Sequence, residues 1–268
     1  SVDSAAEYGS GNIEITFNQS VEDIDNIDVY VDENEVSTQF SDETRTGLGA
    51  DAITITESTF GDVTPNRNLT VNLDVSRNGV ASNISLKDIT VTSNDVDENR
   101  GADNVKRLYE GEMIAITAND ADTEILVEGP NGLELDGSTG AHSKVIPFST
   151  DGLELGTNYT VDYDNGGAES KFRVNNLGLE ADISDTEIST SGTFSVNASA
   201  IRGNSDVTLT LTDEDGNVDL KTHKNLGGNA ETTFSDLSID EDDINGDSDN
   251  YTVEITDNQT GITVATDD

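Results

Sequence analysis

Clustered carboxylates are the residues of this sequence that are best suited to do chemistry. Hard cations such as Ca²⁺ and Mg²⁺ bind oxygen atoms of Asp, Glu, Asn and backbone carbonyls. Three segments offer such oxygens close together. Their candidate ligands are Asp95, Asp97, Glu98 and Asp103 in the first segment, Asp213, Asp215 and Asp219 in the second, and Asp243, Asn245 and Asp249 in the third. The sequence therefore predicts structural calcium or magnesium sites at these segments.

The third segment has the most specific spacing. Aligned on Gly246, it places Asp243, Asn245 and Asp249 at positions 3, 5 and 9 of an EF-hand loop, but Thr252 stands where that loop needs a bidentate Glu. Chance is the competing explanation for all three clusters, because 55 of the 268 residues are Asp or Glu. The segment around Asp215 is equally typical of a hairpin turn.

Asparagine sequons form a second group of candidate sites. The acceptor sequence for N-glycosylation, Asn-X-Ser/Thr, is expected on the surface of a secreted protein. It occurs at Asn18, Asn68, Asn83, Asn158, Asn197, Asn250 and Asn258. Composition alone gives about five such sequences, since 26 Asn and 55 Ser plus Thr give 26 × 55/268. The seven sequons are compatible with a surface glycoprotein and do not by themselves demonstrate one.

Catalytic groups find little support in the sequence. The chain has no Cys, which excludes disulfides and thiolate sites, and its two histidines, His142 and His223, lie far apart. No carboxylate pair for glycoside hydrolysis can be singled out among 55 acids. The absence of Trp removes a common platform for sugar rings. We therefore predict that the chain is not an enzyme and has no catalytic cofactor.

The charge balance indicates the solvent in which the chain works. With 13 Lys plus Arg and 55 Asp plus Glu, the net charge is 13 − 55 = −42. Such charges repel one another in dilute buffer and hardly interact in molar salt, where the Debye length is only about 3 Å. The composition predicts a salt-adapted protein whose stability rises with salt. It also excludes nucleic acid as a partner, because Lys106–Arg107 is the sole basic pair.

Alternating apolar and polar residues predict half-buried β-strands along the whole chain. Ile13, Ile15 and Phe17 show the pattern first, and it recurs through Ile262 and Val264. The strands group into three units, which we expect to be an all-β tandem array of immunoglobulin-like β-sandwiches. The predicted domains are 1–95, 96–176 and 177–268, with an acidic linker at 93–104 between the first two.

Membrane attachment has no signal in the sequence itself. No apolar stretch approaches the roughly 18 residues that a spanning helix needs. The chain begins with Ser1, so it is expected to be a mature product or a segment of a longer protein. Anchoring to a cell envelope would then depend on segments outside this chain.

Four phrases resemble haloarchaeal surface-layer glycoproteins and related cell-surface proteins. They are RLYEGEMIAI (107–116), NYTVDYD (158–164), TLTLTDEDGNV (208–218) and DNYTVEITD (249–257). The resemblance implies immunoglobulin-like domains, glycans on sequons, bound divalent cations and a lattice outside the membrane. The Thr-rich stalk and anchoring helix of that family have no counterpart in this chain.

Together these observations predict an extracellular structural protein of a halophilic archaeon. It would be a building block of a surface layer or surface filament at the cell surface, and thus a homo-oligomer. The same medium demands the same composition of a haloarchaeal virus spike or capsid protein, or of an adhesin, so these alternatives stay open. An accessory module of a secreted enzyme is the less favoured alternative, because Trp is absent.

Overall fold

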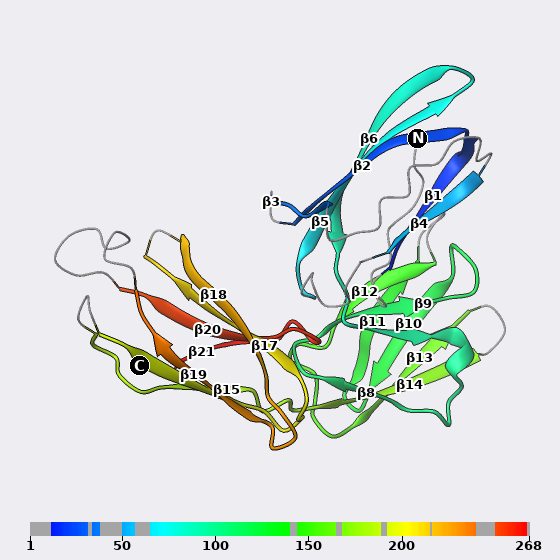
Figure 1. The fold of residues 1–268 in the computed structure, drawn as a ribbon. Helices are drawn as coiled ribbons and strands as arrows, with labels where there is room; N and C mark the ends of the chain where they lie inside the picture. The colour runs from blue at the N-terminus through cyan, green and yellow to red at the C-terminus, as the bar shows by residue number, and fades with distance from the viewer. Residues whose placement is uncertain are drawn as a thin grey trace. The chain divides into compact units, whose positions relative to one another are not determined.

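The computed structural model shows an all-β chain (Figure 1). It describes residues 12–31, 34–37, 50–56, 65–139, 144–164, 168–188, 192–214, 216–239 and 250–266. The chain divides into two compact units, Ser1–Asn175 and Asn176–Asp268. The first unit contains two β-sandwiches with separate cores, and the second unit contains one.

The first sandwich pairs β1 with β4 and packs them against the sheet β3-β2-β5-β6. Its strands are β1 (Asn12–Val21), β2 (Asp23–Val31), β3 (Asn34–Glu35), β4 (Ala50–Thr56), β5 (Asn68–Arg77) and β6 (Val80–Thr90). Residues at every second position enter one core, as in Leu69, Val71 and Leu73 of β5, which are all fully buried. Asn78 and Gly79, both with positive φ, make the tight turn between β5 and β6.

The second sandwich faces the sheet β12-β9-β7 with the sheet β11-β10-β13-β14-β8. Its elements are β7 (Asn94–Asp97), the 3₁₀ turn η2 (Glu98–Arg100), β8 (Lys106–Tyr109), β9 (Met113–Thr117), β10 (Glu124–Gly129), β11 (Gly132–Ser138), β12 (Val145–Ser149), β13 (Asn158–Tyr163) and β14 (Ala168–Asn175). Phe172 lies between Tyr159, stacked at 5.1 Å, and Phe148 of the opposite sheet, at 6.1 Å between ring centroids. These rings tie the two sheets together.

The third sandwich faces β15-β16-β19 with β18-β17-β20-β21. Its strands are β15 (Glu180–Ile183), β16 (Phe194–Ser199), β17 (Asp206–Thr212), β18 (Val218–Asn225), β19 (Glu231–Leu237), β20 (Thr252–Asp257) and β21 (Thr263–Ala265). Phe194, Val196 and Phe234 are buried from the first sheet, and Leu209 and Ile255 are buried from the second.

All three sandwiches have the same order of strands. Six consecutive strands are equivalent in the three sandwiches, namely β1–β6, β9–β14 and β16–β21. The first and the fourth strand of each six pair in one sheet, as β1–β4, β9–β12 and β16–β19 do. The others form the second sheet in the order β3-β2-β5-β6, and likewise β11-β10-β13-β14 and β18-β17-β20-β21. This is the immunoglobulin partition of strands B and E from strands C, F and G. The predicted all-β fold of tandem sandwiches is confirmed.

The structure differs from the sequence prediction at residues 93–104. The predicted linker contains the strand β7, which pairs in parallel with β9, and its Val96 is fully buried in the second core. A four-residue strand with one inward apolar side chain shows no alternation, so the sequence pattern does not reveal it. The predicted domain ranges 1–95, 96–176 and 177–268 stay a prediction.

Asn66 connects the first sandwich to the second. Its side-chain amide nitrogen donates to the backbone oxygen of Gly111 at 3.0 Å, and its amide oxygen accepts from the backbone nitrogen of Met113 at 2.9 Å. Ser93, between β6 and β7, also donates its backbone nitrogen to Met113, at 2.8 Å.

Candidate functional site

The outward faces of the strands carry the sequons. Successive side chains of a strand point to opposite faces, so the Asn and the Ser/Thr of a sequon share one face and the middle residue takes the other. In β13, Asn158 is exposed while Tyr159 between it and Thr160 is fully buried. The sheet thereby presents the acceptor Asn158 and the hydroxyl of Thr160 on the same outer face.

Three sequons occupy the same structural position. Asn68 begins β5, Asn158 begins β13, and Asn250 lies two residues before Thr252, where β20 begins. These three strands are equivalent in the common topology, and all three Asn are exposed. Each sequon continues into a buried valine, in NLTV, NYTV and NYTV, at spacings of 158 − 68 = 90 and 250 − 158 = 92 residues. Sequence reasoning missed this repeat, although the shared Asn-x-Thr-Val at even spacing would have revealed it.

Tyr159 fixes the start of its strand from the inside. Its ring is fully buried against Phe172, and its hydroxyl donates to the backbone oxygen of Glu154 at 3.3 Å. A tyrosine that bonds backbone a few residues upstream of this strand is a recurrent corner of immunoglobulin sandwiches. The anchored backbone holds Asn158 on the outer face.

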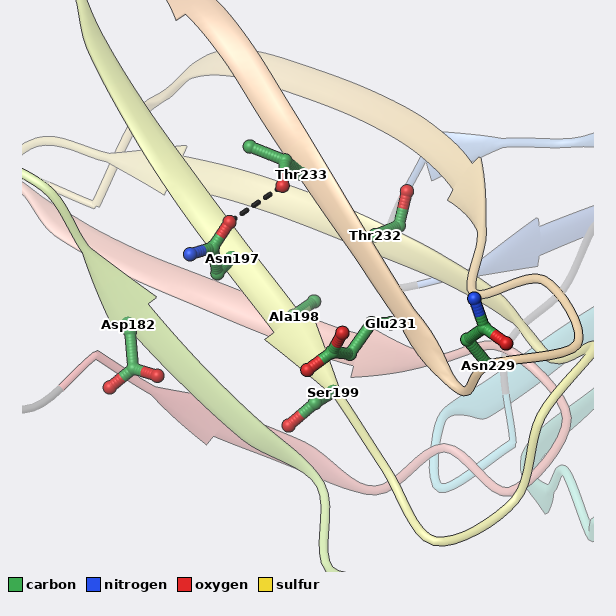
Figure 2. Close-up of a pocket in the computed structure, with 8 residues that line it drawn as sticks. All are labelled: Asp182, Asn197, Ala198, Ser199, Asn229, Glu231, Thr232 and Thr233. Carbon is green, nitrogen blue, oxygen red and sulfur yellow. Dashed lines mark hydrogen bonds between the residues drawn. The ribbon is translucent and has the colours of Figure 1, made fainter.

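Asn197 lies in a polar hollow of about 400 Å³ on the outer face of β15, β16 and β19 (Figure 2). Thr233 of β19 donates its hydroxyl to the Asn197 side-chain oxygen at 2.6 Å. Figure 2 shows the amide nitrogen of Asn197 directed away from Thr233, so the atom that would bear a glycan lies on the open side. Asp182, Ser199 and Glu231 complete a lining rich in oxygen atoms.

The acceptor asparagines of two other sequons, Asn258 and Asn83, form hydrogen bonds with protein side chains. The Asn258 side-chain oxygen accepts from Thr208 at 2.6 Å, and Thr260, the hydroxyl residue of that sequon, is fully buried. The exposed Asn83 donates its amide nitrogen to Asp74 at 2.7 Å. Asn18 lies in β1, but its side chain falls outside the described ones.

Thr260 is part of a buried charged network around Asp257. Asp257 is fully buried at the end of β20, and Arg202 places one guanidinium nitrogen 2.8 Å and 3.0 Å from its two carboxylate oxygens. Ser205 also donates its hydroxyl to this carboxylate. Thr260 donates both its backbone nitrogen and its hydroxyl to Asp257, each at 2.9 Å. A buried carboxylate needs such charge pairing and hydrogen bonding, so these contacts hold the turn after β20 in place.

Two predicted ligands of the first acidic segment accept hydrogen bonds from backbone nitrogens. Asp97 accepts from the backbone nitrogen of Asn99 at 3.0 Å, and the largely buried Glu98 accepts from that of Asn119 at 2.8 Å. Asp95 lies 3.8 Å from the ammonium of Lys106, and Asp103 is exposed.

The other two acidic segments are only partly described. Asp213 accepts from the backbone and the side chain of Asn217, at 2.6 Å and 2.8 Å, as a hairpin turn requires. Asp219 lies in β18, and Asp215 falls outside the described residues, as do Asp243, Asn245 and Asp249. Within the described ranges, no three acidic or histidine side chains gather to hold a metal ion. Calcium or magnesium binding by this chain stays a prediction.

His223 contacts a neighbouring strand and no carboxylate in the described parts of the chain. Its ring nitrogen Nδ1 lies 2.7 Å from the Thr208 hydroxyl. His142 falls outside the described residues.

Burial makes the phenol of Tyr163 a weaker acid. Its hydroxyl donates to the backbone oxygen of Val96 at 3.1 Å, which joins β13 to β7 of the opposite sheet. Loss of water around the buried phenol raises the pKa of Tyr163 far above its ordinary value. A negative charge here would also lie near Asp97 and Glu98.

Within the described residues, no helix is both long and apolar enough to cross a lipid bilayer. No protein-family model matches the chain.

Comparison with known proteins identifies similar chains from salt-adapted archaea. Cell surface glycoprotein 2 of Haloarcula hispanica is 33% identical over 294 residues, which cover 100% of this chain and 30% of that protein. Cell surface glycoprotein 1 of the same organism is also 33% identical and has the same coverage. A cell surface glycoprotein of Haloferax gibbonsii is 34% identical over 165 residues, covering 59% of this chain and 18% of its own length. The chain thus spans less than a third of the curated relatives that it matches, and the predicted resemblance is confirmed.

Solved structures of tandem repeats align along the chain with low overall superposition. The I9–I11 tandem of titin covers 100% of this chain and 95% of its own, at 8% identity and a TM-score of 0.30. A tetra-tandem repeat from the extending region of a large adhesion protein covers 100% and 73%, at 16% identity and a TM-score of 0.25.

Proposed function

Because homologues matching the whole length of this chain are haloarchaeal cell surface glycoproteins, we propose that it is a structural part of an extracellular surface layer. The match along the whole of this chain to proteins of that name, over 30% of their own length, is the observation that carries the proposal. It favours the cell envelope over a virus particle, an adhesin or an enzyme module, which composition alone left open. It also supports an extracellular, cell-surface location.

The repeated sandwich suits such a role. Three sandwiches of one topology place most of their apolar residues inward and most of their acids and sequons outward. A surface with a net charge of −42 stays hydrated and repels its neighbours unless salt screens it. The chain is therefore a hydrated spacer that is stable only in its own saline medium, and it carries no catalytic role.

Assembly with other copies completes the proposal. Acidic faces approach one another when counterions or divalent cations neutralise them. A lattice or filament of such chains would be held partly by cations between molecules, with glycans at exposed sequons such as Asn68, Asn158 and Asn250. Attachment to the envelope would use parts of the longer protein that this chain does not include.

Surface labelling of intact cells tests the proposal. An antibody raised against the chain, with gold detection by electron microscopy, should mark the outer envelope of unbroken source cells at regular intervals. Cells lysed before labelling serve as the control for the cytoplasm. Label confined to the cytoplasm, or found only in the spent medium, would overturn the structural role.

A further inference from the structure

The sequon at Asn197 differs from the sequons at strand starts in its place within a sheet. Asn68 and Asn158 begin their strands, whereas Asn197 lies inside β16, which pairs with β15 on one side and with β19 on the other. Ala198 between the two sequon residues is buried, so Asn197 and Ser199 share the outer face. The sequon is therefore flanked by side chains of both neighbouring strands.

The register of these strands places carboxylates and hydroxyls beside the sequon. Asn197 lies opposite Asp182 of β15 and opposite Thr233 of β19. Ser199 lies opposite Glu231 of β19. Directly opposed side chains of an antiparallel pair have Cβ atoms about 4.5–5.5 Å apart. Together these five side chains line the hollow of about 400 Å³ that Figure 2 shows.

The hollow offers hydrogen-bond acceptors that have no donor from the protein. Among the described residues, the carboxylates of Asp182 and Glu231 form no hydrogen bond or ion pair. Thr233 donates its proton to the side-chain oxygen of Asn197, so its own oxygen is left as an acceptor. An ionised carboxylate accepts hydrogen bonds and cannot donate them. A ligand of this hollow therefore has to bring several donors, as the hydroxyl groups of a sugar ring do.

Asn197 is already oriented for a substituent on its amide nitrogen. Its side-chain oxygen is held by Thr233, and Figure 2 shows the nitrogen directed away from that bond. Because Thr233 and Asp182 lie opposite Asn197 on its two sides, the nitrogen is on the side of Asp182. Glycan attachment forms a bond from this nitrogen to the anomeric carbon of a glycosyl phosphate donor. The carbon–oxygen bond to the phosphate breaks, the nitrogen releases one proton, and the bond from Thr233 is kept.

We propose that the outer face of β15, β16 and β19 binds the first sugar of a glycan on Asn197. We call this surface, formed by Asp182, Ser199, Glu231 and Thr233 around Asn197, the sugar site. The inference rests on the glycan part of the proposed function and names the protein groups that hold the sugar. Hydroxyl groups of the ring donate to the carboxylates of Asp182 and Glu231.

The size and the polarity of the hollow support this occupant. Its volume lies within the range of ligand pockets, about 300–1,000 Å³, but its lining is polar where most such pockets are apolar. A covalent link to Asn197 keeps the ring at a high effective concentration beside the sheet, so a few hydrogen bonds are enough to hold it. The glycan then lies along the third sandwich.

Periodate oxidation of the folded glycoprotein from the source cells tests the sugar site. Periodate cleaves the bond between two carbons that carry free neighbouring hydroxyls, and glycopeptide mass spectrometry reports the cleavage at each sequon. In 3 M NaCl, the sugar on Asn197 should react about tenfold more slowly in the folded protein than after unfolding in urea, the factor expected for about one or two hydrogen bonds. The sugar on Asn158, at an exposed strand start, should react at nearly the same rate in both states.

Two variants identify the residues that hold the sugar. Asp182→Ala and Glu231→Ala, expressed in a haloarchaeal host that attaches glycans, should keep the glycan on Asn197 and lose most of its protection. Both positions are exposed, so the fold should be kept, and circular dichroism checks this. Glu187→Ala removes an exposed carboxylate outside the lining and should leave the protection unchanged.

The outcomes separate the sugar site from the proposed function. An Asn197 without a glycan, in protein that carries glycans at other sequons, would overturn the sugar site and leave the glycoprotein proposal in place. Equal reaction rates of the Asn197 sugar in the folded and unfolded protein would do the same, as would full protection in both Asp182→Ala and Glu231→Ala. Loss of the glycan in either variant would assign that acid to the transfer step instead. Absence of glycans at every sequon would refute both the sugar site and the glycan part of the proposed function, while surface labelling still decides the location.

Discussion

Arg202 and Asp257 form an ion pair in which one guanidinium nitrogen contacts both oxygens of a fully buried carboxylate, at 2.8 Å and 3.0 Å. The pair closes the turn that contains the sequon Asn258–Thr260. Removing one partner of a buried ion pair leaves the other charge without compensation in a medium of low polarity.

Asp257→Asn should therefore destabilise the third sandwich strongly. We expect a loss of about 3–5 kcal/mol in the free energy of unfolding, as for other broken buried pairs. Urea unfolding at constant high salt measures it. Glu180→Gln, at an exposed position on β15, is the matched control and should change stability by less than about 0.5 kcal/mol. Equal stabilities of the two variants would contradict the network.

Tyr163 should limit stability at alkaline pH. Its pKa in the folded chain lies above the unfolded value of about 10, so its contribution is complete below pH 10 and is lost as the pH rises further. Absorbance at 295 nm should show one tyrosine that ionises only when circular dichroism reports unfolding. Tyr163→Phe should remove part of this pH dependence, at a cost of about 1 kcal/mol for the lost bond to Val96. A Tyr163 that ionises in the folded protein would refute the assignment.

Stability should rise steeply with salt. The net charge of −42 is barely screened across the surface at 0.1 M KCl, where the Debye length is about 10 Å, and is almost fully screened at 3 M. Thermal unfolding followed by circular dichroism in the two buffers measures the difference. Equal melting temperatures would remove the argument for salt adaptation.

Glycan occupancy should follow the exposure of each sequon. Asn68, Asn158 and Asn250 are exposed at equivalent strand starts and should carry glycans. Asn258 should not, because Thr260 is buried and its hydroxyl is bound to Asp257. Glycopeptide mass spectrometry of protein from the source cells tells the sites apart. A glycan on Asn258 would mean that modification precedes closure of this turn.

Removal of divalent cations should affect assemblies more than the single chain. The carboxylates of Asp97 and Glu98 are satisfied by backbone nitrogens, so chelation should leave the melting temperature of the monomer at 3 M KCl within about 2 °C. Native assemblies treated in the same way should dissociate in electron micrographs. A large fall in the melting temperature would instead place an ion within the fold, as the spacing of Asp243, Asn245 and Asp249 predicts.

Strands with a regular alternation could be predicted from the sequence, and β7 and β11 could not. Leu69, Val71 and Leu73 alternate because β5 has one face in the core, and β13 shows the same pattern. The strand β7 has one inward apolar residue, Val96, and β11 is largely exposed and alternates only at Leu133 and Leu135, so each gives a weak signal. Backbone pairing with a neighbour makes them strands, and that neighbour is known only once the sheet is formed.

The candidate site shows the same division. The sequence located every sequon, but the distinction between Asn158 and Asn258 depends on which hydroxyl the fold buries. Likewise, nothing in the sequence marks Asp257 among 55 acidic residues as the fully buried one. Its role follows from Arg202, which is 55 residues away along the chain.

The parallel pairing of β8 with β14 has a mechanical consequence. Along the chain, β8 lies near the start of the second sandwich and β14 lies at its end. Their register runs from Lys106 opposite Phe172 to Tyr109 opposite Asn175. Tension between the ends of that sandwich would pull the two strands in opposite directions along their length. Their hydrogen bonds would then be loaded in shear and would have to break together, whereas the bonds of a hairpin pulled apart at its open end break one after another. The second sandwich is thus built to resist stretching between its ends.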